Sequence, residues 1–304
     1  MEKIKTWYEK NLSKVKVNDR VLWKNYLSIL GVVSSAVTLL SFFLTAQNIG
    51  DVAAIIIIAV TFVAALIILF IIMWWKANHK RTVTLKINKT KVCVQEGDIF
   101  SLLDRGVNER AGEVSVVAVN NFYDTIVDNR IIAEKTLHGQ YIKRLTADGK
   151  LEQLNNVIEN DELLNKPENC TEVSNRVKGR KISYSIGSVL EFEGYVLAAF
   201  TKFDGDNKAY LSADEYTEFW MKFWENIDGI YAGRTINIPL MGAGITRFKN
   251  GKPSKQELLE VMIWTLKISG FHNTYSDKQI NIIVYKSDVN DIDFYHTQHN
   301  QSFR

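Results

Sequence analysis

The sequence predicts an α/β protein in which an N-terminal hairpin of two transmembrane helices precedes a three-layer α/β/α domain with a mixed sheet. Two long uncharged apolar runs, separated by a connector of four residues, predict the hairpin. Over the rest of the chain, short runs in which apolar and polar residues alternate, as in strands, are followed by runs with the apolar spacing of amphipathic helices. That alternation predicts helices packed on both faces of a sheet.

The apolar runs are Tyr26–Gln47 and Val52–Trp75. At about 1.5 Å per residue each run spans roughly 33–36 Å, which exceeds a hydrocarbon core of about 30 Å. The connector Asn48–Asp51 leaves room only for a tight turn, so both ends of the hairpin lie on one side. Lysine and arginine flank those ends and are absent from the tip, which predicts a multi-pass protein with both termini in the cytoplasm.

Residues 1–25 carry apolar side chains at helical spacing with lysines between them. This pattern is typical of an amphipathic helix lying at the membrane surface, and a helix packed against the soluble domain is the alternative. The net charge of +3 is concentrated near the membrane, which favours contact with lipid headgroups over nucleic acid. Small and hydroxyl residues share one face of the first span, either for packing on the second span or for lining a multimeric opening.

The remaining chain divides into a domain at residues 82–290 and a C-terminal tail at residues 291–304. Capping boxes at Ser212–Glu215 and Ser254–Glu257 each predict the start of a helix. The first of these helices carries an aromatic stripe that we expect in the core. The other helices are expected at Asp124–Leu145 and Leu151–Ile158, and the strands at Thr82–Ile87, Lys91–Gln95, Val114–Val119, Lys181–Ile186, Tyr195–Phe200, Thr235–Ile238 and Gln279–Tyr285.

Ligands of such sheets bind at the carboxyl ends of the strands, so the residues that follow each strand are the candidates for a site. Gly97-Asp98-Ile99 follows the second strand, Asn120 ends the third, and Gly242-Ala243-Gly244-Ile245 follows the strand that ends at Pro239. A Gly-x-Gly loop can bring backbone N–H groups against a phosphate. An aspartate can accept a hydrogen bond from an exocyclic amine, and Phe248 can cover a sugar. Each motif alone is also a common turn.

Taken in order, these motifs resemble those of a macro domain, the ADP-ribose-binding α/β fold, over Thr82–Asp288. The resemblance implies that Asp98 holds the adenine amine and that Ile99 backs the ring. It implies that the loop of Gly242, Ala243, Gly244 and Ile245 wraps the diphosphate. It also implies that Phe248 lies near the distal ribose, and it makes Asn120 the asparagine of the core strand.

The chain departs from the macro-domain pattern at two places. Hydrolytic macro domains follow the core-strand asparagine with a glycine-rich stretch, whereas residues 120–128 contain no glycine. The insertion Thr146–Lys181 is also atypical, and with it the distal pocket could admit a group bulkier than plain ADP-ribose. We therefore expect binding without catalysis, no metal and no cofactor. The candidates for a hydrolase, which remains the alternative, are Asn120, Asp124, Asp128 and His138.

A hairpin joined to a divergent macro domain resembles the membrane-anchored macro-domain effectors of bacterial Thoeris anti-phage systems. The resemblance implies a TIR-domain partner enzyme that makes an ADP-ribose-derived signal, such as histidine–ADP-ribose. It implies that the chain senses this signal and disrupts the bacterial inner membrane as a homo-oligomer. A membrane-tethered ADP-ribosyl hydrolase and a protein-binding membrane adaptor are the other interpretations.

Overall fold

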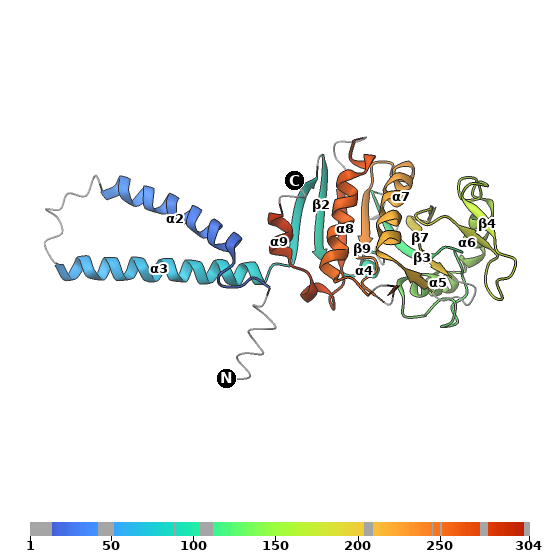
Figure 1. The fold of residues 1–304 in the computed structure, drawn as a ribbon, viewed down its shortest axis with the longest axis horizontal. Helices are drawn as coiled ribbons and strands as arrows, with labels where there is room; N and C mark the ends of the chain where they lie inside the picture. The colour runs from blue at the N-terminus through green and yellow to red at the C-terminus, as the bar shows by residue number, and fades with distance from the viewer. Residues whose placement is uncertain are drawn as a thin grey trace. The chain divides into compact units, whose positions relative to one another are not determined.

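The computed structural model describes residues 14–41, 52–87, 89–103, 112–203, 209–244, 246–249, 251–273 and 279–300. The chain forms two compact units, which are considered separately (Figure 1). The first unit combines the chain up to Arg81 with Asp293–His299, and the second contains Thr82–Ile292. The predicted C-terminal tail is therefore divided between the two units.

The first unit contains three described helices, α2 (Arg20–Ser41), α3 (Val52–Asn78) and α9 (Phe294–His299). Helix α2 begins at Arg20 because the Oδ1 atom of Asp19 accepts hydrogen bonds from the backbone N–H groups of Val21 and Leu22, both at 2.9 Å. Rings of Trp23 and Tyr26 contact the ring of Phe70 of α3, with centroids 4.7 and 5.2 Å away. The two helices thus pack together through aromatic side chains.

Helix α3 contains a segment, Ile56–Asn78, that is long and apolar enough to cross a membrane by length and composition. It is the one such segment among the residues that the structure describes. The first predicted span is helical up to Ser41, and its residues 42–47 lie outside the described residues. Residues 1–13 of the predicted amphipathic helix also lie outside them, and residues 14–19 form a turn rather than a helix.

Val15 fixes the start of the described chain to the end of α3. The Asn78 side chain accepts a hydrogen bond from the Val15 N–H at 3.0 Å and donates to the Val15 carbonyl at 3.1 Å. The indole N–H of Trp74 donates to the same carbonyl at 2.6 Å. Val15 is fully buried by these contacts.

Helix α9 carries the C-terminal segment onto the first residues of α2. The Nε2 atom of His296 lies 2.8 Å from Asp19 Oδ2, and its Nδ1 atom lies 2.6 Å from Asp293 Oδ2. The Tyr295 hydroxyl accepts a hydrogen bond from the Asn25 amide at 2.9 Å. Asp19 therefore caps α2 with one carboxylate oxygen and binds the C-terminal helix with the other.

In the second unit, nine described strands form one mixed sheet in the order β1-β2-β11-β9-β3-β7-β8-β10, with β6 paired to β7. The pairs from β2 through β11, β9 and β3 to β7 are parallel, whereas β1–β2, β6–β7 and β7–β8 are antiparallel. The strands are β1 (Thr82–Ile87), β2 (Thr90–Glu96), β3 (Glu113–Asn120), β6 (Val189–Phe192), β7 (Tyr195–Phe203), β8 (Ala209–Leu211), β9 (Thr235–Pro239), β10 (Arg247–Phe248) and β11 (Gln279–Val284).

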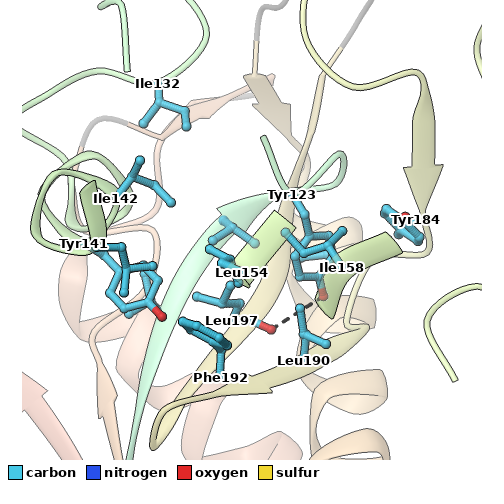
Figure 2. Close-up of a cluster of buried hydrophobic side chains, with 14 of the residues drawn as sticks. Tyr123, Ile132, Tyr141, Ile142, Leu154, Ile158, Tyr184, Leu190, Phe192 and Leu197 are labelled. Atoms are coloured by element: carbon cyan, nitrogen blue, oxygen red, sulfur yellow. Dashed lines mark hydrogen bonds between the residues drawn. The ribbon is translucent and has the colours of Figure 1, made fainter. Parts of the chain in front are cut away.

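Helices cover both faces of this sheet. On one face, Leu197 and Ala199 of β7 belong to a buried cluster with residues of α5 (Leu137–Ala147) and α6 (Leu151–Asn160), shown in Figure 2. The next residue, Phe200, contacts Phe219 of α7 (Ala213–Tyr231) with ring centroids 4.8 Å apart. Helix α8 (Lys255–Ile268) packs beside α7. The prediction of a three-layer domain with a mixed sheet is confirmed.

Several local predictions are confirmed and two are wrong. Both capping boxes form, and the aromatic stripe of α7 is fully buried. The helix expected from Asp124 begins only at Leu137, because Asn129 has a positive φ of 60° and Thr136 caps α5. The strand expected at Lys181–Ile186 shortens to β5 (Ile182–Tyr184), which pairs with β4 (Cys170–Glu172) outside the main sheet.

The contact of α9 with α2 should depend on pH. The pKa of His296 is raised from 6.5 to about 9, first by its hydrogen bond to Asp293 and also by the negative charges of Asp293 and Asp19. The stabilisation is therefore complete below about pH 6.5 and is lost as the pH rises through about 9. We expect hydrogen exchange of the α9 amides, corrected for intrinsic rates, to quicken over this interval.

The variant His296→Gln should exchange quickly at all pH values, and His79→Gln, which changes a partly exposed histidine of the same unit, should behave as the wild type. A pH-independent exchange rate in the wild type would show that protonation of His296 does not stabilise the contact of α9 with α2.

Candidate functional site

The turn after β2, the end of β11 and the loop after β9 lie side by side at one edge of the sheet. These three strands are parallel neighbours, so their carboxyl ends meet there. The N–H group of Gly97 donates to the Val284 carbonyl at 2.9 Å, and the N–H group of Leu240 donates to the Ile283 carbonyl at 3.0 Å. The structure thus brings together the two motifs that the sequence placed far apart, around Asp98 and Gly242.

Asp98 begins helix α4 (Ile99–Leu103). Its Oδ1 atom accepts a hydrogen bond from the Phe100 N–H at 2.9 Å, whereas its Oδ2 atom has no partner among the described residues. Ile99 is buried in a small cluster with Phe100 and Ile283. One carboxylate oxygen is thus available to an amine donor, beside an apolar surface.

The loop from Met241 to Gly244 presents unpaired backbone amides. Gly242 has φ +81°, in the left-handed region that glycine adopts without strain. Among the described residues, the N–H groups of Met241, Gly242, Ala243 and Gly244 donate to no protein acceptor. Successive unpaired N–H groups with such a conformation form an anion-binding concavity, so this loop suits a phosphate group.

Three carbonyl groups of the same loop accept hydrogen bonds from side chains. The Tyr216 hydroxyl donates to the Met241 carbonyl at 3.1 Å. The Lys252 ammonium donates to the carbonyls of Ala243 and Gly244 at 2.8 and 2.6 Å. The sequence analysis singled out neither side chain, since no local motif links either of them to the loop.

The other predicted site residues, Ile245, Phe248 and Asn120, make no described contact with Asp98 or with the loop Met241–Gly244. Ile245 lies outside the described residues. Phe248 lies in β10, half-buried, with its ring centroid 6.1 Å from that of Tyr216. Asn120 is buried at the end of β3, where its amide donates to Asp124 at 3.0 Å and its Oδ1 atom accepts from the Phe122 N–H at 3.1 Å. The side chain of Asn120 therefore stabilises the turn that follows it.

A buried ion pair fixes the long insertion to this turn. The guanidinium of Arg176 binds both carboxylate oxygens of Asp124, at 3.0 and 2.7 Å, and neither side chain is exposed. The same guanidinium lies 3.7 Å from the ring centroid of Phe122. Sequence reasoning missed this pair. The only signal was the basic stretch 176–181, which the fold sets against acidic residues: Lys178 also binds Asp128, at 2.7 Å.

The four candidates for hydrolysis are all engaged in structural contacts. Asn120 and Asp124 bond to each other, and the hydrogen bond from Lys178 lowers the pKa of Asp128 to about 2. Burial lowers the pKa of His138 to about 4, and the negative charge of Asp124 offsets only part of this effect. His138 is therefore neutral at pH 7. Within the described part of the chain, no group of three or more His, Cys, Asp or Glu is placed to hold a metal ion.

Comparison with known proteins gives a family. Residues 92–285 match the family described as Thoeris protein ThsA, Macro domain. The chain belongs to this family. It is also 36% identical over 213 residues to a Thoeris protein ThsA of Bacillus amyloliquefaciens (strain Y2), covering 70% of this chain and 68% of that protein. The predictions of a macro domain and of a Thoeris protein are confirmed.

Two solved structures are also similar. A mutant of the Oceanobacillus iheyensis macrodomain has a TM-score of 0.44 at 12% identity, covering 72% of this chain and 96% of that chain. The macrodomain of the same organism with ADP has a TM-score of 0.38 at 11% identity, covering 72% of this chain and 94% of that chain.

Removing one partner of the buried ion pair should destabilise the second unit strongly. Arg176→Met leaves the Asp124 carboxylate buried without its counterion, which typically costs about 3–5 kcal/mol. The matched control Lys178→Met breaks the exposed pair with Asp128, which typically contributes about 1 kcal/mol or less. Urea unfolding followed by tryptophan fluorescence measures both changes. Equal losses in the two variants would show that burial does not set the strength of the Arg176 pair.

Proposed function

We propose that this protein senses an ADP-ribose-derived nucleotide in Thoeris anti-phage defence, and that binding of the nucleotide makes the first unit disrupt the bacterial inner membrane. One observation carries the sensing part. Among the described residues, four backbone amides of the loop Met241–Gly244 and the Oδ2 atom of Asp98 have no protein partner, and they lie at the same edge of the sheet in a chain of the ThsA family.

The ligand would lie across the carboxyl edge of the sheet. Asp98 Oδ2 would accept from the adenine amine, and Ile99 would support the ring. The amides of Gly242, Ala243 and Gly244 would bind the diphosphate, which places the distal ribose toward Phe248. An amino-acid–ADP-ribose adduct such as histidine–ADP-ribose, made by a TIR-domain partner enzyme, is the proposed signal.

Sensing without turnover is supported by the burial and pairing of the polar side chains that follow β3. A hydrolase needs a group that activates water, with a pKa suited to accepting a proton near neutral pH. Asp124 is paired with buried Arg176, and His138 is buried with its pKa lowered to about 4. Membrane-tethered ADP-ribosyl hydrolysis remains the alternative outcome of the binding experiment below.

The membrane part of the proposal is supported by exposed apolar surface in the first unit. Val32 and Leu39 of α2 are about 70% exposed, and Ile57 of α3 is 65% exposed. Apolar surface of this extent is unfavourable in water and marks contact with lipid or other protein. Two helices cannot enclose a pore, so we propose a homo-oligomer with both termini in the cytoplasm.

The connections between the units supply a route for coupling. The chain passes between the two units at Arg81–Thr82, at Ile292–Asp293 and again at His299–Asn300. Strand β11, whose Val284 carbonyl binds the turn at Gly97, continues through the short helix η4 (Val289–Asp291) into α9. A ligand that converts almost all of the protein from a resting to an active conformation must bind the active conformation more tightly by about 5.5 kcal/mol.

Binding should require both halves of the proposed site. We expect calorimetric titration of the full chain in detergent to show binding of ADP-ribose or its histidine adduct, with no products. Asp98→Ala should weaken binding by about tenfold or more, because the amine loses a charged acceptor. Gly242→Glu should abolish it, because a side chain at φ +81° is strained and its charge repels phosphate.

Asp148→Ala, at an exposed aspartate after α5, is the matched control and should bind as the wild type. Release of ADP-ribose from an ADP-ribosyl substrate would move the protein to the hydrolase class. Failure to bind any of these compounds would refute the sensor.

Membrane disruption has a separate test. The full chain reconstituted in lipid vesicles should release an encapsulated dye only when the bound nucleotide is present. Asp98→Ala should insert equally well but release little dye at the same nucleotide concentration, because it cannot bind the signal. Leakage that does not depend on the nucleotide, or none with a nucleotide shown to bind, would contradict the effector role.

A further inference from the structure

Lys252 contacts the phosphate loop Met241–Gly244 through two of its backbone carbonyl groups. Its ammonium donates to the Ala243 and Gly244 carbonyls at 2.8 and 2.6 Å. It lies two residues before Ser254, the N-cap of α8. Nothing in the macro-domain motifs described above assigns it a role.

The charge of Lys252 is not neutralised by a neighbouring carboxylate. Lys255 binds Asp288 and Asp291, at 2.7 and 2.8 Å, and Lys249 lies 3.6 Å from Glu215. Lys252 has no carboxylate within ion-pair distance among the described residues. Burial, and then the positive charge of Lys255, lower its pKa, whereas the negative charge of Asp288 raises it. The loop therefore has a positive charge beside it that an anionic ligand would stabilise.

Tyr216 holds the same loop at a second point. Its buried hydroxyl lies 3.1 Å from the Met241 carbonyl and 3.2 Å from the Leu258 carbonyl, donating to both. Gly242 fits between these groups, since a Cβ at this position would lie 3.4 Å from both Tyr216 and Leu258. Helix α7, through Tyr216, and the segment entering α8, through Lys252, thus fix the loop together.

These contacts orient the backbone N–H groups of the loop, because the peptide bond is rigid. In a trans peptide the C=O and the following N–H point in opposite directions. The Gly242 N–H therefore points away from the Tyr216 hydroxyl that binds the Met241 carbonyl, and the Gly244 N–H points away from the Lys252 ammonium that binds the Ala243 carbonyl. A donor on each carbonyl also polarises the peptide, which strengthens its N–H as a donor.

We propose that Lys252, with Tyr216, positions the phosphate loop and supplies the charge that selects a nucleoside diphosphate. This inference rests on the proposed function, because it concerns the same site. Lys252 acts through the backbone of the loop, so it is a positioning residue that touches peptide carbonyls rather than the ligand.

The test compares Lys252→Met with Lys252→Arg in the full chain, using ADP and ADP-ribose as probes in calorimetry. The methionine keeps the apolar stem and removes donors and charge, so both probes should bind about tenfold or more weakly. Arginine keeps donors and charge and should restore most of the affinity. Lys249→Met, which removes an exposed lysine of the same segment, is the matched control and should change little.

Two further readouts separate positioning from a general loss of structure. Raising NaCl from about 0.05 to about 0.5 M should weaken ADP binding to the wild type more than to Lys252→Met. Salt screens the positive charge of Lys252, which the methionine variant lacks. Lys252→Met should keep the melting temperature of the wild type, because the contacts of Lys252 are confined to the loop. Tyr216→Phe should weaken binding in the same direction.

Wild-type affinity in Lys252→Met, or an equal loss in Lys249→Met, would overturn the role of Lys252 while leaving the proposed function intact. If the wild-type chain binds neither ADP, ADP-ribose nor the histidine adduct, the proposed function fails and this inference fails with it.

Discussion

The parallel pairing of β2, β11 and β9 is the constraint on which the candidate site depends. Because parallel strands end at the same edge, the turn at Gly97 and the loop at Gly242 become neighbours although they are far apart in the chain. The turn at Gly97 also lies close to β11, since a Cβ at Gly97 would lie 3.2 Å from the Ile283 side chain. Backbone hydrogen bonds from Gly97 and Leu240 to β11 then fix both segments to the same strand.

The turn after β3 is shaped by a buried ion pair instead of glycine. The turn after β3 is held by the amide of Asn120, the carboxylate of Asp124 and the guanidinium of Arg176. A buried pair of this kind is weak evidence for stability, because desolvation of both ions offsets much of their attraction. Its consequence here is geometric: the insertion that carries Arg176 is fixed against the end of β3.

The first unit joins the two ends of the chain. Asp19 caps the first described helix and also binds His296, while Val15 is bonded to the last turn of α3. A single carboxylate thus links the start of α2 to the C-terminal helix. Because the polypeptide enters the second unit at Thr82 and leaves it at Ile292, both connections lead back to this unit.

Local patterns in the sequence determined much of the fold. Strand alternation located most strands of the main sheet, and the capping boxes at Ser212 and Ser254 fixed the starts of α7 and α8. These features succeed because hydrogen bonding within a few residues decides them. The ordered motifs at Gly97–Ile99 and Gly242–Gly244 also sufficed for the macro-domain family, which the comparison with known proteins confirms.

Contacts between distant residues were decided only by the tertiary structure. The pairs Asp124–Arg176 and Asp19–His296, and the hold of Lys252 on the phosphate loop, join residues that no local pattern connects. The irregular segment from Asp124 to Thr136 read as helical because its composition is helix-compatible, yet side-chain bonds to its backbone favour turns. Helix and strand propensities reflect only the local sequence of a segment. Burial and contacts with distant residues decide which secondary structure it adopts in the fold.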